Sequence, residues 1–271
     1  VYEVNERMLE LTRNALHQHA CDLGCLIAYD IAKAIPGCLP LIADPGVVDE
    51  LSPLAKISGS PLLPRYCIWH ALNQKAIARR YARDIGKRYE DLNLIICHLG
   101  GGISIAAHEH GLAIDANNAL GGEGPFSPER AGSLPVADLI RLCFSGKYTM
   151  EQLLKNVTTE TGLRAHLGTN DVKEILQRID QGDQHAQLIL DAMLFHTAKA
   201  IASEAAVLYG KVDAILLTGG IAYSDYVVNK LKERIDFLAP VITYPGEDEM
   251  QAMSNNALAV LRGELKTKEY H

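Results

Sequence analysis

Residues 92–107, LNLIICHLGGGISIAA, join two apolar runs through three consecutive glycines, Gly100, Gly101 and Gly102. Each run has the length and composition of a buried β-strand. Glycine has no Cβ, so the chain can turn tightly here and present its N–H groups to a ligand. The stretch therefore predicts a tight hairpin, and it leaves open whether the turn only connects two strands or also cradles a phosphate.

A second glycine pair has the same setting. Residues 216–222, LLTGGIA, run from an apolar segment into Gly219 and Gly220 and then into a helical pattern. Two strand-to-glycine turns in one chain favour a nucleotide that is held between two backbone edges.

Three strands in hairpin order, followed by alternating helices and strands, predict an α/β fold of the ribonuclease-H-like type. The first half of the chain adds two helices, over 5–21 and 26–35, and a short buried strand, Leu39–Ala43, that ends at Asp44. The remaining elements expected from periodicity are strands at 92–99, 103–108, 112–117, 212–218 and 241–244, and helices at 71–88, 135–144, 184–209, 224–234 and 249–265.

Composition excludes several classes of protein. A chain of 271 residues with 48% hydrophobic and 22% charged residues can bury a full core. Its net charge of −7 argues against a nucleic-acid partner. It contains no apolar run of the ~18 residues that a membrane span requires, and nothing that resembles a signal peptide. The six cysteines show no zinc-like pairing, so we expect buried thiols in a protein of the reducing cytoplasm.

Three segments together resemble one family. Residues 98–104 (HLGGGIS), 115–133 (DANNALGGEGPFSPERAGS) and 216–222 (LLTGGIA) are similar to butyrate kinases of the acetokinase family, in the superfamily of acetate and sugar kinases, Hsc70 and actin. The resemblance extends from about Tyr2 to the end. It implies two domains: residues 1–47 as the remainder of an N-terminal domain I, covered by the C-terminal helix at 250–271, and a nucleotide-binding domain II at 48–249.

One feature departs from the family pattern. Family members open with two strands joined by a phosphate-holding loop, and they carry a substrate arginine in an upstream Gly-Arg-Gly-Gly segment. This chain begins at Val1 without either. We therefore expect it to resemble a family member that lacks roughly its first quarter, with domain I incomplete.

The implied activity is the phosphorylation of a short-chain carboxylate, butyrate + ATP to butyryl phosphate + ADP, with Mg²⁺ and by direct in-line transfer. Such a reaction requires charge stabilisation on the phosphoryl group more than covalent help. The resemblance assigns this task to Arg130 and His70, with His98 as a further candidate. Sequence alone also allows Arg130 to be a loop arginine paired with Glu129 or Glu123, and His70 to be a cap or core residue.

The same resemblance gives nucleotide and metal positions. It places phosphate on Gly100, Gly101 and Gly102, and the nucleoside on Gly219, Gly220, Asp171, Val172 and Lys173. A helix that is N-capped at Asn170 or Asp171 explains the latter segment equally well. Metal support falls to Asp44 and to one acid of Glu247-Asp248-Glu249, of which we choose Glu249; first-turn helix acids explain all three. Apolar residues around Ile68 and Trp69 are candidates for an acyl pocket.

Alternatives remain open. After His70 the acetate kinases have Gly-Thr-Ser-His, whereas this chain has Ala71-Leu72-Asn73-Gln74, a difference that concerns substrate preference. An acetate, propionate or branched-chain fatty acid kinase is the nearest rival, and a nucleotide-binding fragment without activity is a rival of another class. We expect a homodimer or higher homo-oligomer in the cytoplasm, with no nucleic-acid or membrane partner. The acyl-chain preference is not determined by the sequence.

Overall fold

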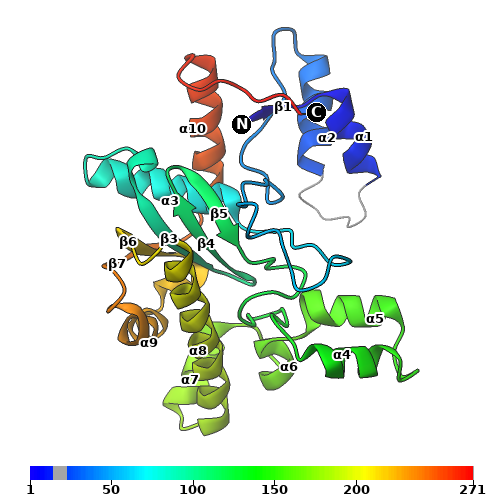
Figure 1. The fold of residues 1–271 in the computed structure, drawn as a ribbon, viewed down its shortest axis with the longest axis vertical. Helices are drawn as coiled ribbons and strands as arrows, with labels where there is room; N and C mark the ends of the chain where they lie inside the picture. Colours follow the sequence, from blue (N-terminus) through cyan, green and yellow to red (C-terminus); the bar gives the residue numbers. More distant parts are fainter. Residues whose placement is uncertain (15–22, 271) are drawn as a thin grey trace. The chain divides into compact units, whose positions relative to one another are not determined.

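The computed structural model describes residues 1–14 and 23–270 (Figure 1). They divide into two compact units, unit 1 with Val1–Pro45 and Asp248–His271, and unit 2 with Gly46–Glu247. The expected boundaries at 47/48 and 249/250 lie two residues from these, and the division into two domains stays a prediction. The strands are β1 Tyr2–Glu3, β2 Leu41–Ile42, β3 Asn93–Leu99, β4 Ile103–Glu109, β5 Leu112–Ala116, β6 Ala214–Gly219 and β7 Val241–Pro245. The α-helices are α1 Glu6–Arg13, α2 Leu23–Ala34, α3 Ala71–Asp84, α4 Val136–Cys143, α5 Met150–Lys155, α6 Leu163–Leu167, α7 Val172–Asp180, α8 Gln184–Val207, α9 Asp225–Ile235 and α10 Glu249–Leu261.

Unit 2 contains a five-stranded sheet in the order β5-β4-β3-β6-β7. The hairpin strands β3, β4 and β5 pair antiparallel, whereas β6 and β7 add in parallel on the other side of β3. This arrangement agrees with three hairpin strands followed by a helix–strand tail. Parallel strands in one sheet are buried on both faces, which explains why every residue of β6 is buried.

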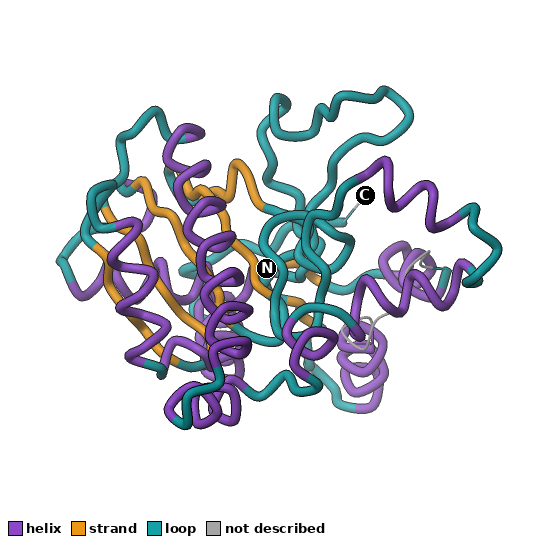
Figure 2. Tube along the Cα trace, turned by 90° about the horizontal axis from the view of Figure 1, so that it is seen from below, coloured by secondary structure: helices purple, strands orange, loops and turns teal. Residues whose placement is uncertain are grey.

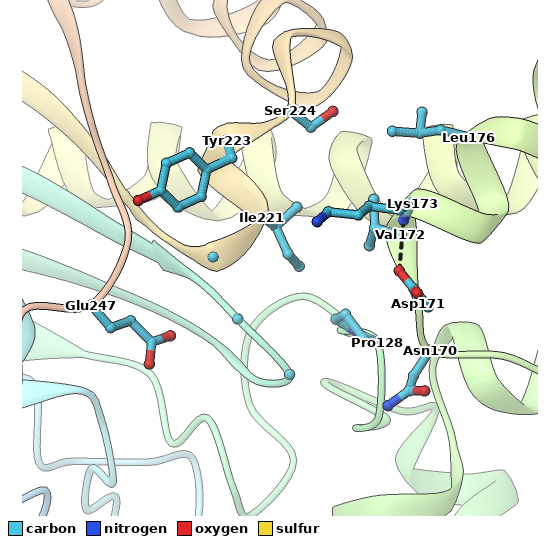
Figure 3. Close-up of a pocket in the computed structure, with 13 residues that line it drawn as sticks. Pro128, Asn170, Asp171, Val172, Lys173, Leu176, Ile221, Tyr223, Ser224 and Glu247 are labelled. Atoms are coloured by element: carbon cyan, nitrogen blue, oxygen red, sulfur yellow. Dashed lines mark hydrogen bonds between the residues drawn. The ribbon is translucent and has the colours of Figure 1, made fainter.

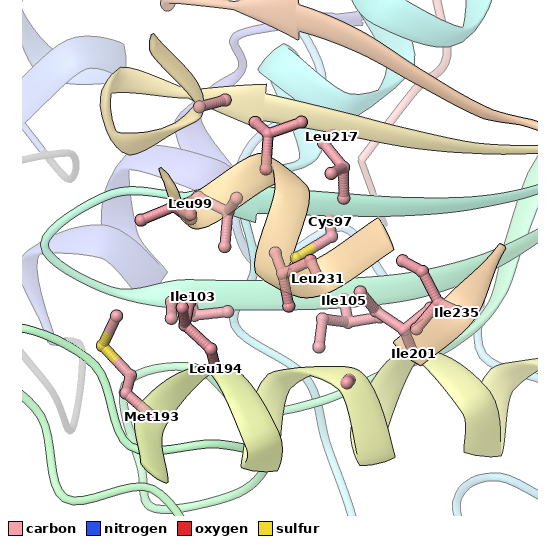
Figure 4. Close-up of a cluster of buried hydrophobic side chains, with 14 of the residues drawn as sticks. Cys97, Leu99, Ile103, Ile105, Met193, Leu194, Ile201, Leu217, Leu231 and Ile235 are labelled. Atoms are coloured by element: carbon pink, nitrogen blue, oxygen red, sulfur yellow. The ribbon is translucent and has the colours of Figure 1, made fainter. Parts of the chain in front are cut away.

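The two faces of the sheet carry alternate residues of β3. Ile95, Cys97 and Leu99 belong to a large cluster with residues of α7, α8 and α9, whereas Leu94 and Ile96 pack with residues of α3. Figure 4 shows Met193, Leu194 and Ile201 of α8 facing strand residues Ile103 and Ile105. Helices therefore flank the strands on both sides (Figure 2), and the carboxyl ends of β3 and β6 are held rigidly by the core.

Unit 1 is small and has its own apolar cluster. Val4, Met8, Leu9 and Cys25 are buried, with Tyr2, Leu26, Tyr29 and Ile42 packed against them. The expected strand at 39–43 is only two residues long and half-buried, because it pairs with the equally short β1 and not with a larger sheet. Asp44 follows it, buried and in a left-handed backbone conformation (φ 40°). Residues 15–21 of the expected helix at 5–21, Cys21 included, lie outside the described residues.

Two further expectations are wrong. The helix that begins at Ala71 ends at Asp84 and not at Arg88, because Gly86 adopts a positive φ of 67° that a helix cannot continue through. Burial of the cysteines holds for Cys25, Cys67 and Cys97, whereas Cys38 and Cys143 are exposed. Cys143 ends α4, a helix with no buried residue, and Cys38 follows the turn at Pro36 and Gly37.

Within the described residues no helix is long and apolar enough to cross a membrane.

Glu204 on α8 gives a test of the core. Its side chain is buried, and its Oε2 atom has no hydrogen-bond partner in the part of the chain that the structure describes. Burial raises the pKa of this carboxyl from 4.5 to about 8, so it is protonated in the folded protein at neutral pH. The stability contributed by the neutral form is present below the unfolded-state pKa and is lost as the pH rises through about 8.

We predict that, as the pH rises from 5 to 8, the free energy of unfolding of Glu204→Gln increases by about 3 kcal/mol relative to that of the parent. The reason is that only the parent has a buried carboxyl that must stay protonated in the folded state. Urea denaturation across this range measures the difference. Glu233→Gln, at an exposed position of α9, is the control and should follow the parent. Parallel pH profiles for Glu204→Gln and the parent would contradict the assignment.

Candidate functional site

The loop between β3 and β4 consists of the three glycines alone. Leu99 and Ile103 are register partners, and the N–H of Gly100 donates to the carbonyl of Gly102 at 3.1 Å. None of the three glycines has a positive φ. The hairpin is confirmed, but the glycines are not required by the backbone angles of the turn.

Residues 100–102 must be glycines because neighbouring side chains occupy the space of a Cβ. A Cβ on Gly102 would overlap the guanidinium of Arg130, and one on Gly101 would lie 3.2 Å from a carboxylate oxygen of Glu129. A Cβ on Gly100 would lie 2.9 Å from Nε2 of His98. The glycines thus let three charged or polar side chains lie directly against the main chain.

Arg130 is held on the hairpin by its own loop. Ser127 Oγ donates to the carbonyl of Gly101 at 2.7 Å and accepts from the Arg130 N–H at 3.1 Å. The Nη1 group donates to the carbonyl of Ala119 at 3.0 Å. The Nε atom is buried without a partner among the described residues, and burial lowers the pKa of the guanidinium. A partly buried cation with an unused donor is suited to an anionic ligand.

The alternative pairings of Arg130 do not form as its main contacts. Glu123 instead binds Arg65, through Nε at 3.1 Å and Nη2 at 3.3 Å. Glu129 accepts from Asn170 Nδ2 at 2.5 Å and from Arg164 Nη2 at 3.4 Å. Neither carboxylate therefore hydrogen-bonds the guanidinium of Arg130, which remains available for an anionic ligand.

His70 and His98 stack with ring centroids 3.8 Å apart and planes 11° apart. His70 precedes α3 and makes no side-chain cap; its Nδ1 lies 2.8 Å from Ser104 Oγ. Burial, together with the charges of His98 and Arg130, places the pKa of His70 well below 6.5, so its ring is neutral.

His98 is buried between two partners. Its Nδ1 lies 2.9 Å from Asn73 Oδ1, and its Nε2 lies 3.1 Å from Glu247 Oε1. The hydrogen bond to His98 lowers the pKa of the Glu247 carboxyl, which therefore stays ionised.

A pocket of about 480 Å³ opens beside the hairpin, within the size range of small-molecule sites. Figure 3 shows Lys173 at the start of α7 and Ile221 in the turn after β6 on one side, with Glu247 at the far end. The lining residues are Gly100, Gly101, Pro128, Asn170, Asp171, Val172, Lys173, Leu176, Gly220, Ile221, Tyr223, Ser224 and Glu247.

Six of the eight predicted nucleotide residues line this pocket, and Gly102 and Gly219 do not. Gly219 has a φ of 91°, and a Cβ there would lie 2.7 Å from the carbonyl carbon of Leu99. Gly219 is therefore needed where β6 packs closely against the end of β3. Asp171 is the N-cap of α7, since its Oδ1 accepts from the N–H of Lys173 at 2.8 Å. The cap and a pocket position are thus compatible.

The predicted metal residues lie in unit 1, where Asp44 is buried and Glu249 begins α10 in an exposed position. Glu247, the alternative that we did not choose, lines the pocket of unit 2. The described residues contain no group of three or more His, Cys, Asp or Glu side chains that could hold a metal ion. Mg²⁺ is commonly held by one or two carboxylates, waters and substrate phosphates, so a single carboxylate such as Glu247 fits an ion that arrives with the phosphates.

Sequence reasoning missed several residues of this region. Ser127 fixes the loop around the hairpin, and Tyr223 and Leu176 line the pocket. Asn170, expected as a possible N-cap, donates to Glu129 and also lines the pocket. Trp69, a candidate for an acyl pocket, is buried, and its Nε1 donates to the carbonyl of Val48 at 3.3 Å; its role as a pocket residue stays a prediction. A polar residue inside an apolar strand, Ser104 between Ile103 and Ile105, was the available signal for the partner of His70.

Comparisons with known proteins agree on one family. The model of the acetokinase family matches residues 60–247. A probable butyrate kinase of Bacteroides thetaiotaomicron is 62% identical over 270 residues, covering 100% of this chain and 76% of that protein. Butyrate kinase 1 of Clostridium acetobutylicum is 51% identical, covering 99% and 76%.

Solved structures show the same fold. Acetate kinase of Porphyromonas gingivalis superposes with a TM-score of 0.82 at 20% identity, over 96% of this chain and 74% of that chain. A propionate kinase of Francisella tularensis gives a TM-score of 0.77 at 20% identity, over 93% and 73%. The expected fold class, that of the actin, Hsc70 and sugar kinase superfamily, is confirmed by these matches.

We predict that Gly102→Ala and Gly220→Ala affect different properties, the first the rate through Arg130 and the second the binding of nucleotide in the pocket. The Cβ at residue 102 displaces Arg130, so the rate of phosphoryl transfer should fall at least tenfold while ADP affinity changes little. A Cβ at residue 220 would meet nothing within 4 Å of the protein, and Gly220 lines the pocket, so the variant should weaken ADP binding without loss of fold. Calorimetry and steady-state kinetics measure the two effects, and equal effects of both variants on ADP affinity would contradict this separation.

Proposed function

This chain belongs to the acetokinase family, and we propose that it transfers the γ-phosphoryl group of ATP to a short-chain carboxylate, with butyrate as substrate. Relatives that are 51% and 62% identical are named butyrate kinases. The observation in unit 2 that carries the proposal is the position of the Arg130 guanidinium. It lies against Gly102 in the loop of the β3–β4 hairpin, and the adjacent Gly101 lines the pocket.

In this reaction an oxygen of the ionised carboxylate attacks the γ-phosphorus. The new O–P bond forms as the bond from phosphorus to the bridging oxygen breaks, and ADP leaves with that electron pair. No proton has to move, which agrees with a site that offers donors and charges but no activated base. Arg130 and the neutral ring of His70 would stabilise the oxygens of the transferring group, with His98 beside them.

The pocket would hold the nucleotide. Gly100, Gly101 and Gly220 allow the backbone to approach the phosphates, while Asp171, Val172 and Lys173 at the start of α7 would lie along the nucleoside. A bound Mg²⁺ would neutralise phosphate oxygens. We propose Glu247 of unit 2 as its support; the separate alternative, implied by the resemblance, is support from Asp44 and Glu249 of unit 1.

Two statements about the whole protein also belong to this proposal. We propose a cytoplasmic protein, since Cys25, Cys38, Cys67, Cys97 and Cys143 are all free thiols. We also propose a homo-oligomer, since α4 has no buried residue and exposes Val136, Ile140 and the neighbouring Phe144, an apolar surface of the kind that subunit contacts cover.

The rival activities are distinguished by a substrate series. Acyl phosphate formation is measured with acetate, propionate, butyrate and isobutyrate, alongside ADP binding by calorimetry. We expect ADP binding and the highest kcat/KM with butyrate. Preference for acetate, propionate or isobutyrate would instead assign an acetate, propionate or branched-chain fatty acid kinase. ADP binding without formation of acyl phosphate would identify a nucleotide-binding chain without the activity.

We predict that Arg130→Ala lowers kcat by about 10³ while the KM for butyrate changes little, because the charge acts on the transferring group. Arg130→Lys should recover only part of the rate, since an ammonium lacks the planar fork. Arg164→Ala, at an arginine that binds Glu129 at the edge of the same loop, is the control. An unchanged turnover number in Arg130→Ala would refute the role.

A further inference from the structure

A row of buried polar side chains lies behind His70, between α3 and β4. Gln74, Ser104 and His108 are fully buried, although they carry hydrogen-bonding groups that are costly to bury unpaired. The proposed reaction uses none of them directly. Their contacts determine where each proton of the row resides.

The amide of Gln74 has one possible orientation. Its Nε2 lies 3.1 Å from the carbonyl oxygen of Ser104, and a carbonyl only accepts, so this atom must be the NH₂ group. Its Oε1 then faces Nε2 of His108 at 3.0 Å and accepts a hydrogen from it.

The orientation of Gln74 fixes the tautomer of His108. Burial and the charges of Lys75 and Arg79 lower its pKa to about 3, so the ring is neutral and carries one hydrogen. That hydrogen is on Nε2, and Nδ1 accepts from the hydroxyl of Tyr89 at 2.6 Å.

The hydroxyl of Ser104 links Gln74 to His70 and determines which ring nitrogen of His70 accepts a hydrogen bond. Its oxygen accepts from the second hydrogen of Gln74 Nε2 at 2.9 Å and from the backbone N–H of His70 at 3.3 Å. Both lone pairs are then occupied, and the hydroxyl hydrogen is left for Nδ1 of His70, 2.8 Å away. An accepting Nδ1 in a neutral imidazole requires the hydrogen on Nε2.

We propose that Gln74 and Ser104 are positioning residues that lock His70 as the neutral tautomer with its hydrogen on Nε2. This inference rests on the proposed function, in which the neutral ring of His70 stabilises an oxygen of the transferring phosphoryl group. Because Nδ1 is engaged by Ser104, Nε2 is the ring nitrogen that remains for that contact. The opposite tautomer would present a lone pair to that anionic oxygen and repel it. Two residues that never touch the substrate would thus decide whether His70 assists the transfer.

The experiment measures the tautomer directly, on the full chain without ligands. Protein labelled with ¹⁵N-histidine is examined by long-range ¹H–¹⁵N correlation spectroscopy, which separates protonated from unprotonated ring nitrogens; a His70→Gln variant assigns the signal. We expect a protonated Nε2 and an unprotonated Nδ1 at His70. A protonated Nδ1 in the parent chain would overturn the proposal.

Two variants test the positioning. In Ser104→Ala the donor to Nδ1 is gone, so both tautomers of His70 should be populated and kcat for acyl phosphate formation should fall at least tenfold with an unchanged KM for ATP. Gln74→Glu is nearly isosteric, but its carboxylate accepts from the Ser104 hydroxyl and so favours the hydrogen on Nδ1. Ser104→Thr keeps the hydroxyl and should preserve both the parent tautomer and most of the rate.

Tyr89→Phe is the matched control at the far end of the row. It removes one hydroxyl from the same network, but the carbonyl of Ser104 still orients Gln74, so the tautomer of His70 and the kcat should not change. A lost tautomer with unchanged kcat in Ser104→Ala would overturn the positioning role. If the parent shows the expected tautomer but forms no acyl phosphate with any carboxylate, the proposed function fails and the assignment of the tautomer stands.

Discussion

The absence of side chains at residues 100–102 is the constraint on which the candidate site depends. The guanidinium of Arg130 occupies the volume that a Cβ of residue 102 would fill, and Glu129 and His98 approach the two neighbouring glycines in the same way. Charged groups can therefore lie against a backbone that is fixed by the β3–β4 register. A site arranged before the substrate arrives avoids reorganisation during the reaction, which is the main source of electrostatic catalysis.

The sheet could be predicted from the sequence because its signals are local. The apolar runs of β3, β4 and β6 and the glycines after them mark both the strands and their turns. One error was local, because Gly86 follows the end of α3 by two residues in a left-handed conformation and is a sequence signal for the helix terminus. The other error falls where distant residues decide, since β1 pairs with β2 across about forty residues with only two register partners. A strand of two residues carries no periodicity that a sequence pattern could detect.

The site was only partly predictable. The resemblance led to Arg130, His70 and Glu249, and these roles stay predictions. That Glu247 lines the pocket depends on where β7 ends, which the sequence pattern does not define to the residue. Gln74 and Asn73 occupy positions at which this chain departs from the acetate kinases. In this chain Gln74 contacts Ser104 and His108, and Asn73 contacts His98. The residues at these departing positions thus contribute to the hydrogen bonds around both stacked histidines.

The charge states of Arg130 and His70 follow from their proximity. Two cations held close together in a partly buried site repel one another, and the charge of Arg130 contributes to the low pKa of His70. A neutral imidazole removes this repulsion while it keeps one N–H donor. Neutrality, however, creates a choice between two tautomers that a doubly protonated ring does not have. A site that combines one arginine with one neutral histidine must therefore fix the tautomer by other means, and the buried amide and hydroxyl behind His70 are groups that can do so.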